Sequence, residues 1–211
     1  MSSARESILK AAIELFSEKG YKRTSVREIC SKAKVNVAAV NYHYKSKLGV
    51  GRAVIDYLFE DYEERQEVLF PSAPIKTAEE WENRIKDFIY HFILLREGKD
   101  EKSYYRSKLI FSELDAPSEI YDEIYNVYLE PFQKKLIEYI KMGLPLDTPE
   151  NKITLWFMTI ISQCIMFRKK IFDNSALPAL DLSEKENVKI FAEHIASTVL
   201  HSLKYWKKET I

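Results

Sequence analysis

Residues Thr24–Lys47 read TSVREICSKAKVNVAAVNYHYKSK, and this stretch predicts two short helices joined by a tight turn. Ser25 and Glu28 have the spacing of a capping box, the reciprocal pair of hydrogen bonds that starts a helix. Apolar residues then recur at positions 26, 29, 30 and 33, which places them on one face of a helix. Asn36 is a good N-cap for the second helix, expected over Val37–Tyr44. Small side chains at its start and polar ones on one side are typical of a recognition helix, whose first residues enter the major groove of DNA.

The residues that flank this helix pair are of the types that contact DNA phosphates. The stretch begins with Thr24 and Ser25, with Arg27 close behind, and it ends with KSK at 45–47. The alternative interpretation is a pair of ordinary surface helices with basic flanks. If the pair binds DNA, the expected contact residues are Thr24, Ser25, Arg27, Asn36, Val37, Ala38, Ala39, Asn41, Tyr42, His43 and Lys47.

Residues 8 to about 54 resemble the DNA-binding domain of the tetracycline-repressor (TetR) family of transcriptional regulators. The resemblance rests on ILKAAIELFSEKGYKRTSVREIC, which begins at Ile8, and on YHYKSK at 42–47. It implies a homodimeric regulator that binds a near-palindromic double-stranded DNA operator. It further implies a repressor that is released from the operator by a small-molecule effector.

Two positions depart from the family pattern. The turn between the helices usually carries glycine, and Lys34 stands there. If that residue keeps a left-handed conformation, its side chain costs on the order of 1 kcal/mol. Asn41 replaces the usual tyrosine of the recognition helix. Because asparagine can pair with both N6 and N7 of adenine, Asn41 either reads a base or only contacts phosphate.

The charge of the chain is unevenly distributed. The 211 residues carry 32 basic and 32 acidic side chains and therefore no formal net charge. Residues 1–52 hold eleven lysines and arginines and four acidic residues, a net charge of +7, so the remainder carries −7. A basic N-terminal part on an acidic body is the pattern of a DNA-contacting head attached to a domain with another task.

Helical spacing recurs along the whole chain and no alternating strand pattern is present, so the predicted fold is all-α. A three-helix helix-turn-helix head over residues 1–47 is expected to precede a ligand-binding and dimerisation domain over 48–211, with about nine helices in all. Helices are expected at about 47–70, 78–95, 103–114, 117–142, 149–172 and 183–207. Gly49 and Gly51 near the start of the 47–70 helix are either tolerated glycines or a soft pivot for the head.

The body contains aromatic residues at helical spacing, which for each one is compatible with ordinary core packing. The family resemblance implies that some of them line a small-molecule pocket. The candidate pocket residues are Phe88, His91, Phe92, Tyr105, Phe111, Tyr125, Tyr128 and Met158.

The last two helices carry apolar stripes that exceed the needs of one small domain. Pairing with the same helices of a second copy would form a four-helix bundle, whereas the alternative is an intramolecular core. The expected interface residues are Trp156, Ile160, Gln163, Phe167, Ile195, Val199, Leu203 and Trp206.

Other functional classes find little support in the sequence. The four histidines do not join cysteines or carboxylates at the spacing of a metal site, and no phosphate loop, G-x-S-x-G or HExxH motif is present. We therefore expect no enzyme activity, no metal and no cofactor. Cys30 and Cys164 lie in apolar helical patterns and are expected to be buried free thiols, with redox sensing at Cys164 as an alternative. No apolar run is long enough to span a bilayer, so we expect a cytoplasmic protein that is not in a membrane.

Overall fold

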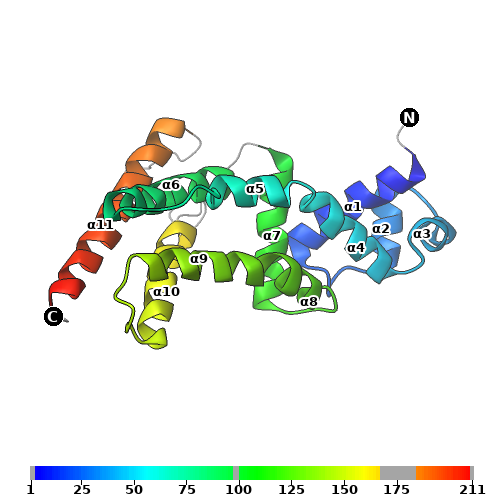
Figure 1. Ribbon diagram of the computed structural model, residues 1–211. Coiled ribbons are helices and arrows are strands. Elements are labelled where there is room, and N and C mark those ends of the chain that lie inside the picture. Colours follow the sequence, from blue (N-terminus) through cyan, green and yellow to red (C-terminus); the bar gives the residue numbers. More distant parts are fainter. Residues whose placement is uncertain (1–2, 97–99, 167–183, 210–211) are drawn as a thin grey trace, which may run out of the picture. The chain divides into compact units, whose positions relative to one another are not determined.

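The computed structural model describes residues 3–96, 100–166 and 184–209, and every regular element in these ranges is helical (Figure 1). This confirms the predicted all-α fold. The elements are α1 Ala4–Lys19, α2 Val26–Ala33, α3 Val37–Tyr44, α4 Lys47–Leu58, α5 Tyr62–Leu69, α6 Ala78–Arg96, α7 Glu101–Asp115, α8 Tyr121–Ile124, the π-helical segment η1 Tyr125–Leu129, α9 Glu130–Met142, α10 Glu150–Met166 and α11 Lys185–Glu209.

The helix starts predicted from Ser25 and Asn36 are confirmed, and α1 begins with a capping box of the same kind. Ser3 and Glu6 form a capping box at α1, and Ser25 with Glu28 forms a second one at α2. At α3 the side-chain oxygen of Asn36 accepts a hydrogen bond from the backbone N–H of Ala39 at 2.9 Å. Each of these caps satisfies backbone donors that the first turn of a helix leaves without partners.

The chain divides into two compact units. The head unit consists of residues 1–63 and 99–130, and the body unit consists of residues 64–98 and 131–211. The boundary predicted at residue 47, between a DNA-binding domain and a ligand-binding and dimerisation domain, concerns function and stays a prediction.

The core of the head unit is built from α1, α2, α3, α4, α7 and α8. Ile8, Phe16 and Ile29 are fully buried where the first three helices meet. Val54 of α4 and Leu109 of α7 belong to the same cluster. Each fully buried side chain of this size contributes about 1.5–3 kcal/mol relative to an exposed one, so α3 packs against a well-stabilised core.

The prediction of a single helix over residues 47–70 is wrong. Helix α4 ends at Leu58 and α5 begins at Tyr62. The buried side chain of Arg106, from α7, binds both sides of the break: its Nε donates to the backbone oxygen of Leu58 at 2.5 Å, and its Nη2 donates to Asp61 at 2.7 Å. An arginine on a distant helix therefore binds a carbonyl at the end of α4, and local sequence could not reveal this contact.

The helix predicted over 117–142 begins instead at Tyr121 and contains a π-helical segment at 125–129. Pro131 lies two residues after the end of this segment and has no N–H, so it cannot continue a regular ladder of hydrogen bonds. The N–H of Glu130 reaches back five residues to the oxygen of Tyr125, and the hydroxyl of Tyr62 donates to the oxygen of Tyr128 at 3.1 Å. Short π segments of this kind often mark functional positions.

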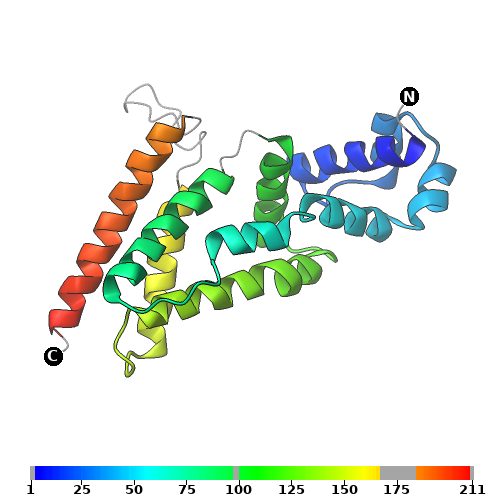
Figure 2. The ribbon, with the colours of Figure 1, turned by 45° about the horizontal axis from the view of Figure 1, so that its top comes forward.

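The body unit is centred on α6, which lies beside α11 in both views, with α10 packed on both (Figure 2). Its core contains Ile85, Phe88 and Ile89 of α6 together with Ile195 and Val199 of α11. None of the helices in the described ranges is both long and apolar enough to cross a membrane.

Candidate DNA-binding interface

Helix α3 has one buried and one exposed face. Val40 and Tyr44 are four residues apart and face the core of the head unit, where the Tyr44 hydroxyl donates to the backbone oxygen of Arg5 at 2.8 Å. On the other face Ala38, Asn41 and Tyr42 are exposed, and Tyr42 exposes 75% of its surface. A short helix held from behind, with a small residue at its start and two polar side chains outward, can enter the major groove and place hydrogen-bonding groups on base edges.

The turn between α2 and α3 is a Schellman motif. The N–H of Val35 donates to the oxygen of Cys30 at 3.0 Å, and the N–H of Lys34 donates to the oxygen of Ser31 at 3.3 Å. Lys34 has φ 55° and ψ 44°, the left-handed conformation that this motif requires and that glycine usually supplies. The sequence left open whether this turn keeps a left-handed residue, and the structure shows that Lys34 is left-handed.

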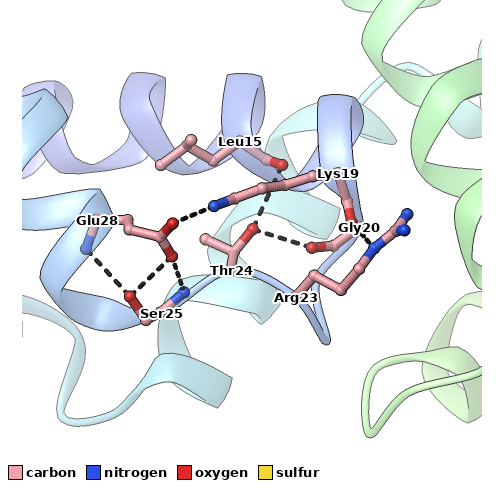
Figure 3. A network of polar contacts seen from close by, with 7 residues as sticks. All are labelled: Leu15, Lys19, Gly20, Arg23, Thr24, Ser25 and Glu28. Carbon is pink, nitrogen blue, oxygen red and sulfur yellow. Dashed lines mark hydrogen bonds and ion pairs between the residues drawn. The ribbon is translucent and has the colours of Figure 1, made fainter.

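A network of polar contacts fixes the start of α2 (Figure 3). The carboxylate of Glu28 accepts hydrogen bonds from the backbone N–H of Ser25 at 2.7 Å and from its hydroxyl at 2.8 Å, and it pairs with Lys19 from the end of α1. The hydrogen bond with Lys19, followed by those with Ser25, lowers the pKa of Glu28 to about 2.

The side chain of Thr24 points into the head unit. Its hydroxyl lies 2.9 Å from the oxygen of Gly20 and 3.3 Å from that of Leu15 (Figure 3), and only 2% of the residue is exposed. The side chain ties the end of α1 to the segment before α2 and does not lie with the exposed side chains. A phosphate contact by Thr24 therefore stays a prediction that its burial does not favour.

Lys47, at the start of α4, is half-buried. Its ammonium lies 4.0 Å from the centre of the Tyr21 ring, within the range of a cation–π interaction. Burial lowers the pKa of Lys47, and the carboxylates of Glu119, Glu113 and Glu28 oppose that shift. The hydroxyl of Tyr21 donates to Glu119 at 2.8 Å, so the ring that holds Lys47 is itself anchored to the segment between α7 and α8.

The structure brings most of the predicted DNA-contacting side chains to the surface of the head unit. Ala39, His43 and Lys47 are half-buried and Thr24 is buried. The exposed members of the set are Ser25, Arg27, Asn36, Val37, Ala38, Asn41 and Tyr42.

Comparison with known proteins identifies both parts of the chain. Residues 8–54 match the family described as bacterial regulatory proteins, tetR family. Residues 81–203, more than half of the chain, match the C-terminal domain of the HTH-type transcriptional dual regulator CecR. The chain belongs to the TetR family of bacterial transcriptional regulators.

The relatives of this TetR-family chain are transcriptional regulators, and the matches cover most of their length. It is 26% identical over 153 residues to the probable HTH-type transcriptional regulator YttP of Bacillus subtilis, a match that covers 68% of this chain and 70% of that protein. It is 23% identical over 175 residues to the dual regulator CecR of Shigella flexneri, covering 78% and 75% of the two chains. The protein is therefore a transcriptional regulator with a helix-turn-helix DNA-binding domain, in a family whose members are not enzymes.

Solved structures show the same fold. A TetR-like regulator from Rhodococcus sp. RHA1 superposes with a TM-score of 0.60 at 16% identity and covers 95% of this chain and 98% of that one. A putative fatty acid metabolism regulator from Clostridium perfringens gives a TM-score of 0.57 at 22% identity, with 90% and 97% covered. At such identities the likeness concerns the fold alone.

The candidate pocket residues of this TetR-family regulator are divided between the two units. Tyr105, Phe111, Tyr125 and Tyr128 belong to the head unit, whereas Phe88, His91, Phe92 and Met158 belong to the body unit. Phe88 and Phe92 stack with ring centres 5.7 Å apart, His91 is half-buried, and Met158 is 58% exposed.

Sequence reasoning missed two members of the aromatic cluster in the body unit. Phe132 packs against Phe88 and Phe92, and Phe70 packs against Phe88 and Phe132. Their helical spacing was visible, but nothing local indicated that residues 18 to 62 positions apart would meet.

The predicted interface residues lie largely inside one chain. Ile160, Ile195, Val199 and Leu203 are at most 2% exposed in the body core, and Trp156 and Gln163 are half-buried. Phe167 lies outside the described residues, as does the side chain of Trp206. The exposed apolar residues of α10 are Leu155 and Met158, each 58% exposed.

The described residues contain no group of three or more His, Cys, Asp or Glu side chains that could hold a metal ion. Both cysteines are buried free thiols, as predicted. Burial raises the pKa of Cys164 to about 12, with Arg96 opposing the shift, so the thiolate that redox sensing needs is disfavoured.

Proposed function

We propose that this TetR-family regulator is a homodimeric, ligand-responsive repressor that binds a near-palindromic operator through α3 and acts in the cytoplasm. The observation that carries the proposal is the exposed face of α3, where Asn41 and Tyr42 stand outward while Val40 and Tyr44 anchor the helix. The excess of basic residues in the first 52 positions supports the attraction of this part of the chain to DNA phosphates.

The homodimer follows from the small reach of one recognition helix. A helix of eight residues contacts only a few base pairs, whereas two copies address half-sites about 34–36 Å apart or a multiple of that spacing. The exposed pair Leu155 and Met158, three residues apart on α10, offers apolar surface for the partner subunit.

The effector is proposed to bind in the body unit, near the aromatic cluster of Phe70, Phe88, Phe92 and Phe132. Binding sites for small molecules are mostly apolar and aromatic with a few polar groups, which this cluster resembles. Release from DNA then requires that the effector binds more tightly to the dimer geometry that does not fit adjacent major grooves.

The alternative is a small-molecule binding module whose head no longer binds DNA. Selection of duplexes from a random pool with the purified protein, at two salt concentrations, distinguishes the proposed regulator from this alternative. We expect recovery of a near-palindromic motif and a steep loss of binding as salt rises. Recovery of no motif, with only weak salt-sensitive retention, would contradict the proposal and favour the alternative.

A further inference from the structure

The backbone of the head unit adopts positive φ at three places. One is Gly20, with φ 86°. The other two, and the only non-glycine residues with positive φ in the part of the chain that the structure describes, are Lys34 with φ 55° and Lys45 with φ 68°. Each lies at one end of α3: Lys34 two residues before the N-cap Asn36, and Lys45 directly after Tyr44.

Lys34 occupies a position that favours glycine or asparagine. The Schellman motif fixes its left-handed conformation through the hydrogen bonds of Lys34 and Val35 to α2. A β-carbon in this conformation lies too close to the following carbonyl oxygen, so lysine makes the turn less stable than glycine does. The side chain is exposed and lacks ion pairs and hydrogen bonds to the described residues.

Lys45 occupies an even less common conformation. With φ 68° and ψ −39°, and with the N–H of Ser46 donating to the oxygen of Tyr44 at 2.8 Å, it is the central residue of a γ-turn with positive φ, which is rare and strained. The turn is so tight that a β-carbon at Gly49 would lie 1.9 Å from the oxygen of Tyr44. The Lys45 ammonium lies 3.3 Å from the oxygen of Tyr42, so it can bind the end of α3 when DNA is absent.

We propose that Lys34 and Lys45 are phosphate-binding residues that hold the two ends of α3 against the DNA backbone. The inference rests on the proposed use of α3 as the recognition helix. It adds Lys34 to the expected contact set and gives Lys45, whose residue type already indicated a phosphate contact, a definite place at the end of α3. Backbone strain persists where the surrounding structure over-determines it and where the residue serves a function. Here that function is phosphate binding by the exposed ammonium groups, because phosphate contacts fix the register of a protein on the duplex.

Purely structural roles for these lysines make a different prediction. If Lys34 only completes the turn, replacing it by glycine improves folding and leaves DNA binding alone. If Lys45 only binds the oxygen of Tyr42, replacing it leaves the salt dependence of DNA binding unchanged.

The experiment measures Lys34→Gly, Lys34→Asn and Lys34→Arg in the full-length chain. Binding to a labelled duplex of random sequence is titrated over a series of salt concentrations, and thermal unfolding is recorded for each protein. We expect Lys34→Gly to raise the melting temperature by about 2–4 °C. The same variant is expected to lose about fivefold to tenfold in affinity at 0.1 M salt, and its salt slope is expected to fall by about one unit per protomer.

Asparagine tolerates the left-handed conformation without a charge, so Lys34→Asn should weaken binding like the glycine variant. Arginine keeps the charge, so Lys34→Arg should retain the wild-type slope. Lys189→Gln, which removes an exposed lysine of α11, is the matched control and should leave the slope unchanged.

Lys45 is tested by Lys45→Gly and Lys45→Arg in the same assay, with the same expected loss and recovery of slope. A wild-type slope in both glycine variants would overturn the proposal, as would an arginine variant that binds as weakly as the glycine variant. A wild-type protein that fails to bind the duplex would overturn the proposed function as well, which distinguishes the two failures.

Discussion

At the scale of single residues, burial of the Thr24 hydroxyl favours a structural role for this residue over a DNA-binding one. It lies within hydrogen-bond distance of two carbonyl oxygens of α1 and its C-terminal end, Leu15 and Gly20. Threonine before a helix was predicted to contact phosphate because residue type alone does not tell which way a side chain points. Ser25, the next residue, is exposed and can still contact DNA at that end of α2.

Replacing Thr24 by valine, which has the same shape, should remove the hydrogen bond that the hydroxyl donates and lower the free energy of unfolding by about 1–2 kcal/mol. Urea denaturation measures this loss. The salt slope of DNA binding should stay at the wild-type value, and a slope lower by one unit would instead assign a phosphate contact to Thr24.

Glu28 predicts how the head responds to acid. Its pKa is lowered in the folded protein to about 2, so the stability that its carboxylate contributes is complete above the ordinary glutamate pKa and is lost as pH falls towards 2. The melting temperature of the wild type should therefore fall more steeply below about pH 4.5 than that of Glu28→Gln. Parallel curves for the two proteins would show that the network with Ser25 and Lys19 contributes nothing.

At the scale of helices, the starts marked by capping residues were predictable, whereas several other boundaries were not. The caps at Ser3, Ser25 and Asn36 depend on residues within one turn, and sequence shows them directly. The end of α4 depends on Arg106, 48 residues away from Leu58 along the chain. The π segment lies shortly before Pro131, which has no N–H to donate, and spacing rules do not predict a change of helix type there.

Arg106→Met should lower the free energy of unfolding by about 2–4 kcal/mol, because it removes the hydrogen bonds that the buried guanidinium donates to the oxygen of Leu58 and to the carboxylate of Asp61. Lys102→Met is a control on the same helix, since it removes an ion pair with the exposed Glu60 and should cost under about 1 kcal/mol. Equal losses in the two variants would contradict this account of the break between α4 and α5.

At the scale of the whole molecule, the sequence predicted the fold and the DNA-binding head better than the uses of the body. Apolar residues at helical spacing serve a core, a pocket or a dimer interface equally well. In the structure Ile160, Ile195 and Val199 belong to the core of one chain. Which face of α10 is exposed can be determined only once its packing against α6 and α11 is known.

The double variant Leu155→Glu, Met158→Glu should sediment as a monomer in analytical ultracentrifugation, since charges at these two positions would oppose burial against a partner subunit. It should also bind DNA more weakly, because two recognition helices no longer act together. Lys86→Glu, at an exposed position of α6, should remain a dimer. A double variant that stays dimeric would place the interface elsewhere.

The central claim is that the exposed face of α3 reads DNA sequence. The most direct test compares wild type with the double variant Asn41→Ala, Tyr42→Ala on the duplex recovered by selection and on a scrambled duplex of the same composition. We predict that wild type prefers the recovered duplex by about a thousandfold or more. The variant should lose most of this preference and keep its salt-dependent binding to both. An unchanged preference in the variant would contradict the claim that α3 is the recognition helix.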